Sequence, residues 1–135
     1  MFRLIKILNG RINQGEPVRL PSKPKEKYTY GEALVLANGV LTKCGETVMP
    51  THICAEDYEA PENGNRDIVA EPVSSEMIFE APLSASPSSD LVVGSLVKLH
   101  TDGLQVTADT TDGGVAKIFN LNGAKETGDT VLVRF

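Results

Sequence analysis

The chain has 135 residues, of which 41% are hydrophobic and 23% charged, with a net charge of −5. A chain of this length can bury a core of its own without cross-links, and the absence of Trp, with 5% aromatic residues, predicts an aliphatic core. No apolar run approaches the roughly 20 residues that span a bilayer. Arg3, Lys6 and Arg11 interrupt the apolar start before a signal-peptide core develops. We therefore expect neither a membrane segment nor a cleaved leader.

The first 27 residues differ in charge from the rest of the chain. Residues 1–27 contain seven basic and two acidic side chains, whereas residues 28–135 contain six basic and 16 acidic ones. Glycines and prolines prevent a long helix in the first segment, and residues 1–8 would place apolar side chains on both faces of a strand. We predict an extended basic arm over residues 1–27, whose apolar end is covered by its own body or by a neighbouring chain.

Residues 28–135 contain short β-branched runs separated by turn residues, a pattern typical of a small barrel or sandwich. Asn38 and Gly39 lie between two such runs and form the pair that best tolerates a type I′ turn, so they predict a hairpin of residues 32–37 and 40–44. Helical periodicity is absent, and we expect at most a helical turn or two near residues 89–93. Further strands are predicted at residues 52–55, 67–73, 77–83, 96–100, 104–108, 115–121 and 130–135.

The predicted fold class is all-β: a small β-barrel or sandwich of about eight short strands with an extended N-terminal arm. Residues 55–66 are acidic and turn-rich, and residues 84–90 are small and polar, so both are predicted to be exposed loops. The second loop could separate two halves. We favour a single domain over residues 28–135, because the 45 residues after the loop are few for an independent core.

The chemically reactive residues form no recognisable catalytic motif. Cys44, His52, Cys54 and His100 are of the types that bind zinc, but their spacing lacks a paired C-x2-C knuckle, and free buried thiols are the favoured interpretation. No G-x-S-x-G sequence or nucleotide-binding glycine motif occurs, and the carboxylates of residues 55–66 are typical of a solvated surface. We therefore expect no enzyme activity, no metal and no cofactor.

Four stretches resemble the decoration, or cement, proteins that stabilise the heads of tailed phages. They are MFRLIKILNGRIN, YGEALVLANGVLTKCGETVMPTHICAED, VGSLVKLHTDGLQVTADTTDGG and GDTVLVRF, which together cover about half of the chain. The resemblance implies a virion protein, made in the host cytoplasm, that binds the outer capsid surface and bridges capsid subunits. It implies the major capsid protein as partner and a homo-oligomer, with trimers common in the family. It implies no catalytic residue.

The apolar-tipped basic arm supplies the candidate contacts for this hypothesis. An apolar strand suits addition to an exposed sheet edge, repeated equivalent sites strengthen attachment, and cations suit an acidic capsid surface. The residues predicted to bind the capsid or a neighbouring subunit are Phe2, Arg3, Leu4, Ile5, Lys6, Ile7, Leu8, Arg11 and Arg19.

Two alternatives stay open. The first is a small β-barrel that binds nucleic acid through the basic arm. The acidic body and the lack of an aromatic residue in the basic part of the arm disfavour nucleic acid as a partner. The second is a fibre or receptor-binding module.

Overall fold

The structure, a computed structural model, describes residues 1–8, 16–63 and 66–135 and confirms the all-β prediction. Two five-stranded sheets and one two-stranded sheet are formed, and all strand pairs are antiparallel. The part of the chain that the structure describes contains no helix, and so none that could cross a membrane.

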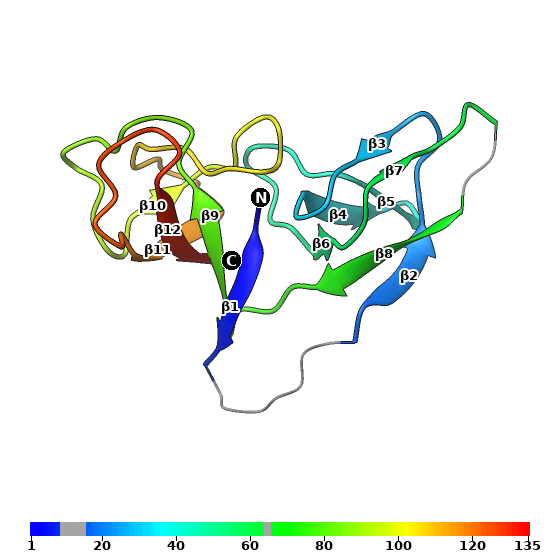
Figure 1. The fold of residues 1–135 in the computed structure, drawn as a ribbon, viewed down its shortest axis with the longest axis horizontal. Coiled ribbons are helices and arrows are strands. Elements are labelled where there is room, and N and C mark those ends of the chain that lie inside the picture. The colour runs from blue at the N-terminus through cyan, green and yellow to red at the C-terminus, as the bar shows by residue number, and fades with distance from the viewer. Residues whose placement is uncertain (9–15, 64–65) are drawn as a thin grey trace.

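Sheet A joins the start of the chain to its C-terminal half (Figure 1). Alternation along its strands sends Phe79, Ile118 and Val131 inward, where they are fully buried, and leaves Lys117 and Phe119 on the outer face. β1 and β10 are the two edges of this sheet. The strand order is β1 (Arg3–Ile7), β9 (Met77–Pro82), β12 (Thr130–Arg134), β11 (Ala116–Asn120) and β10 (Leu96–Val97).

Sheet B contains the predicted hairpin. Leu36 pairs with Leu41 across the turn, and Asn38 and Gly39 have φ angles of 51° and 80°, as a type I′ turn requires. The strand order is β2 (Val18–Pro21), β8 (Asp67–Pro72), β6 (His52–Cys54), β4 (Ala33–Ala37) and β5 (Val40–Lys43). A small third sheet, formed by β3 (Lys27–Tyr28) and β7 (Tyr58–Glu59), lies on the sheet B side of the molecule (Figure 1).

Two hydrophobic clusters form the core. The larger one is centred on sheet A, but it also contains Ala33, Cys44 and Ile53 from the sheet B region, so both sheets contribute to one hydrophobic cluster. The smaller cluster, which includes Tyr28 and Ile68, is formed mainly by side chains of sheet B. The chain passes from sheet B to sheet A between β8 and β9, not at residues 84–90.

Two local predictions, those for residues 104–108 and 55–66, are wrong. Residues 104–108 form no strand, because Val106 makes only single bridges, to Leu83 and Leu99. Residues 89–93, where the sequence predicts at most a helical turn or two, contain turns and no helix, with Leu91 N donating to Ser88 O at 3.1 Å. Residues 55–66 are not wholly an exposed loop, because β7 lies within them and the Tyr58 ring stacks on Tyr28 at 6.4 Å. Tyr58 thus packs one side of this acidic segment against the rest of the fold.

Candidate partner-binding surface

β1 is held at the edge of sheet A by its own chain. Leu4 pairs with Phe79 and Ile7 with Met77. Phe2, only 2% exposed, packs its ring edge-on against Phe135 at 5.4 Å. Of the two coverings predicted for residues 1–8, the structure shows the one by the chain's own body.

A shift in register decides which side chains of β1 face outward. The pairing with β9 shifts between Leu4 and Lys6, as it does at a β-bulge, where one strand carries an extra residue. Leu4 and Ile7 can therefore both pack against the core although they are three positions apart. Ile5 becomes the extra residue and is 46% exposed. The bulge explains why apolar residues occur at consecutive positions of this edge strand.

The predicted contact residues fall into separate groups. Those anchored in or against the core are Phe2, Leu4 and Ile7. Those exposed on β1 or directly after it are Arg3, Ile5, Lys6 and Leu8. Arg19 is exposed on β2, the edge strand of sheet B, opposite Val69. Arg11 lies outside the described residues.

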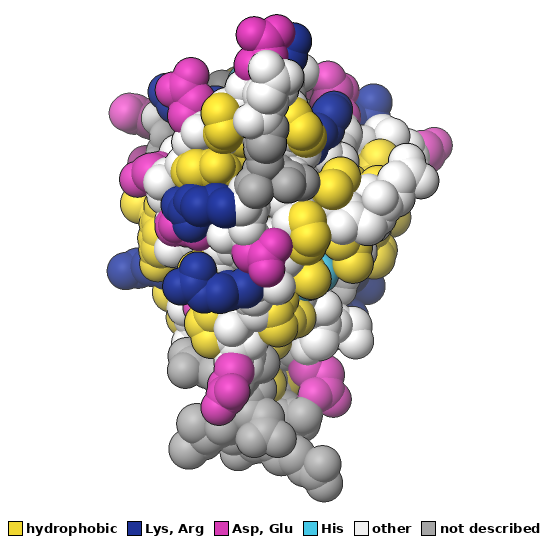
Figure 2. All heavy atoms as spheres, turned by 90° about the vertical axis from the view of Figure 1, so that its right-hand side faces the viewer, with side chains coloured by type: hydrophobic (Ala, Val, Ile, Leu, Met, Phe, Trp, Pro, Cys, Tyr) yellow, Lys and Arg dark blue, Asp and Glu magenta, His cyan; other side chains and the backbone are white. Residues whose placement is uncertain are grey.

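Several cations of residues 1–27 pair with acids of the same chain. Arg3 binds Glu80, Lys25 binds Glu62, and Lys23 lies 3.5 Å from Glu26. Exposed pairs of this kind contribute little stability, about 0–1 kcal/mol each, but they reduce the charge that the segment presents. Figure 2 looks onto the sheet B end of the molecule, where basic side chains lie among acidic and hydrophobic ones. The positive charge of residues 1–27 is thus partly neutralised by acidic side chains of the same chain.

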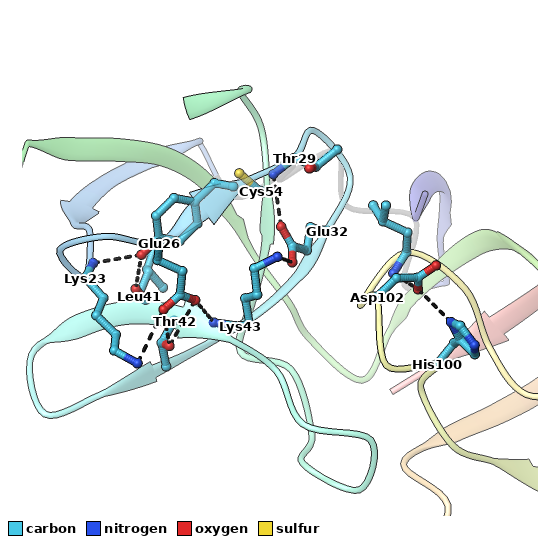
Figure 3. A network of polar contacts seen from close by, with 12 residues as sticks. Lys23, Glu26, Thr29, Glu32, Leu41, Thr42, Lys43, Cys54, His100 and Asp102 are labelled. Atoms are coloured by element: carbon cyan, nitrogen blue, oxygen red, sulfur yellow. Dashed lines mark hydrogen bonds and ion pairs between the residues drawn. The ribbon is translucent and has the colours of Figure 1, made fainter. Parts of the chain in front are cut away.

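A polar network ties the hairpin to the segment before it (Figure 3). Glu32 is 1% exposed, and its carboxylate accepts from Thr29 N and lies beside Lys43 Nζ, both at 2.9 Å. Glu26 accepts from Thr42 Oγ1 at 2.9 Å and from the Lys43 backbone. These carboxylates are held by donors of their own chain, so we assign them a structural role.

The four residues weighed as zinc ligands do not come together. Cys44 belongs to the larger hydrophobic cluster and Cys54 to the smaller one, and His100 Nδ1 lies 3.2 Å from Asp102. Within residues 1–8, 16–63 and 66–135, no group of three or more His, Cys, Asp or Glu side chains is placed to hold a metal ion. Cys44 Sγ donates to Val48 O at 2.8 Å and Cys54 Sγ to Glu56 O at 3.0 Å.

Both thiols are expected to resist modification in the folded protein. Burial raises the pKa of Cys44 and of Cys54 to about 11, against an ordinary value of 9.0, and the thiolate is the reactive form. At pH 8 the thiolate fraction should fall about 100-fold below that of the unfolded chain, and burial slows the reagent further. The measurement is release of thionitrobenzoate from Ellman's reagent with and without guanidinium chloride. One rapidly reacting thiol in the native protein would contradict the expectation.

Glu56 and Arg66 are expected to make stability depend on acid pH. The Arg66 guanidinium binds the carboxylate at 2.8 and 3.2 Å, and Val69 N donates to it at 2.7 Å. The Arg66 hydrogen bonds, more than any other contact, lower the pKa of Glu56 from 4.5. The stabilisation is therefore complete above pH 4.5 and is lost as the pH falls through the lower folded pKa. Melting temperatures of the protein and of Glu56→Gln should differ at pH 6 and converge toward pH 3; a constant difference would contradict this linkage.

Beyond β1, a groove of about 600 Å³ lies at one end of sheet A. Leu8, directly after β1, lines it together with Met49, Leu96, Lys117 and Arg134. Met49 comes from the β5–β6 connection, and Leu96, Lys117 and Arg134 come from β10, β11 and β12. Among the described lining residues, only Leu8 belongs to the predicted contacts. The groove combines apolar and basic side chains on one surface.

The fold is similar to that of a known phage protein. No protein-family model and no curated protein matches the sequence. Among solved structures, the head fiber gp8.5 N base of bacteriophage phi29 is similar, with a TM-score of 0.57 and 12% identity. The superposition covers 88% of this chain and 93% of the phi29 chain. At this identity, the likeness shows a shared fold.

Proposed function

We propose that this chain is a structural virion protein that binds the outer surface of a phage capsid, with the major capsid protein as its partner. The observation that supports this most strongly is the fold shared with the N base of a phage head fiber over 88% of this chain. The resemblance of the sequence to phage decoration proteins also favours a structural protein of the virion. We further propose that it acts by binding, without catalysis, and that it self-associates, with a trimer as the expected state.

The two edge strands near the start of the chain support a bridging role. β1 presents Ile5 and Lys6 at the edge of sheet A, and β2 presents Arg19 at the edge of sheet B. Edges of two different sheets can contact two neighbouring capsid subunits at once, and simultaneous contacts raise the overall affinity. In this proposal the protein stabilises the head by linking the subunits beneath it.

The test uses heads produced from the genome that encodes the chain. Purified protein should cosediment saturably with heads that lack it, and coated heads should release DNA at a higher temperature than bare ones. Ile5→Ser combined with Lys6→Glu should lower occupancy, whereas Lys125→Glu, an exposed change in the β11–β12 connection, should not. Absence of the protein from purified virions, together with no binding to heads, would contradict the proposal.

A head-fiber base is the second candidate, because the similar phi29 chain is itself the base of a head fiber. The two candidates differ in the length of the polypeptide in the virion: a decoration protein would consist of this fold alone, and a fiber base would be joined to further fiber sequence. Mass spectrometry of the virion band should give 14.5 kDa for a decoration protein of this sequence alone and a larger mass for a fiber base.

A further inference from the structure

The groove at the end of sheet A has two properties that do not contribute to the stability of the fold. The first is exposed apolar surface: Leu8, Met49 and Leu96 line the groove while 41%, 56% and 41% exposed. The second is unbalanced charge. Lys117 and Arg134 line it with Glu76 as the acidic side chain, and neither cation forms an ion pair with any described residue.

The two cations are also direct neighbours. Lys117 on β11 and Arg134 on β12 are register partners, so like charges stand opposite each other on the outer face of the sheet. Such a pair is unfavourable within a sheet. An anionic group bound between Lys117 and Arg134 would relieve this repulsion.

Apolar surface extends from the groove along β10 and β11. Beyond the Leu96–Lys117 pair, Ile118 N donates to Ser95 O and Gly94 N to Ile118 O, at 2.9 and 2.8 Å. The exposed side chain of Phe119, two positions along β11 from Lys117, lies on this continuation. The surface is therefore longer than the groove and suits an extended chain better than a small molecule.

We propose that this groove binds an extended peptide segment of a partner protein that carries both carboxylates and apolar side chains. Leu8, Met49 and Leu96 would receive the apolar side chains, and Lys117 and Arg134 the carboxylates. A second copy that pairs this face with itself about a two-fold axis is disfavoured, because the pairing would oppose cation to cation. If the partner is the capsid, the inference rests on the proposed function, and the peptide segment in the groove is an acidic segment of the capsid surface.

The binding test uses the full chain and two defined peptides with blocked ends, ELDLEF and its charge-reversed form KLKLKF. In ¹⁵N-¹H spectra, ELDLEF should shift the amides of Leu8, Met49, Leu96, Lys117 and Arg134 selectively, and KLKLKF should not. Lys117→Glu/Arg134→Glu should weaken ELDLEF binding at least about tenfold. Lys27→Glu/Lys125→Glu makes the same charge change at exposed positions outside the groove and should bind normally. Equal shifts from both peptides, or none up to millimolar concentration, would overturn the proposal.

Two further measurements separate this inference from the proposed function. If the protein coats heads and Lys117→Glu/Arg134→Glu coats them equally well, the groove assignment is wrong while capsid binding stands. If the protein binds no heads but ELDLEF still maps to the groove, capsid binding is wrong while the peptide site stands. Tighter binding of the oligonucleotide dT10 than of ELDLEF at the same amides would overturn the peptide assignment in favour of nucleic acid.

Discussion

Gly114→Ala is expected to destabilise the fold by about 3 kcal/mol, because the added methyl group has no space. A Cβ at this position would lie 2.7 Å from both the N and the O atom of Val97. These are backbone atoms of β10, and Val97 is paired with Ala116 in sheet A. Relief of the clash would require β10 to separate from the residues before β11, and Val97 is fully buried in the larger cluster.

The neighbouring glycine provides the matched control. Gly113 has a φ of +78°, which disfavours alanine, but a Cβ there would meet nothing within 4 Å. Gly113→Ala should therefore cost only the left-handed backbone penalty, about 1 kcal/mol. Urea unfolding of both variants measures the difference directly. Equal destabilisation would show that backbone conformation, not the contact with Val97, determines the requirement for glycine here.

Local signals in the sequence predicted much of the fold. Asn38-Gly39 located the hairpin because the required φ angles are a property of those two residues alone. The run of residues 130–135 predicted β12, and Val131 and Val133 lie on its buried face because side chains alternate along a strand. The β-bulge of β1 has no such signal. It arises where Leu4 and Ile7 both meet the core, and that depends on packing against β9.

The candidate surface was harder to predict for the same reason. Leu8 was identified because it belongs to the apolar run of residues 1–8, but Met49, Leu96 and Arg134 are far from it in sequence and meet it only after both sheets have formed. For Arg3 the difficulty is the reverse. Its positive charge is visible in the sequence, but its ion pair with Glu80, 77 residues away, is not. Sequence patterns give the type of each side chain, whereas tertiary pairing decides which charges remain free.

The position of β1 also changes how its role can be tested. Removal of residues 1–20 would take away an edge strand from each large sheet, β1 and most of β2, and would uncover Met77 and Phe79. Loss of capsid binding in such a truncated chain would not distinguish a missing contact from a damaged fold. Single substitutions on the two faces of β1 make that distinction.

Phe2→Ala is expected to destabilise the protein by about 3–5 kcal/mol, the usual cost of removing a buried aromatic ring. Phe2 packs edge-on against Phe135, which in turn contacts Phe79 at 5.6 Å, so a cavity here loosens both β1 and the end of β12. Ile5→Ser, on the exposed bulge of the same strand, should change stability by no more than about 0.5 kcal/mol. Urea unfolding and head binding should then separate the two variants: Phe2→Ala lowers stability, while Ile5→Ser lowers only head occupancy. A stable Phe2→Ala protein would show that β1 is not anchored by its first aromatic side chain, and residues 1–8 would again be an arm free to reach a neighbouring chain.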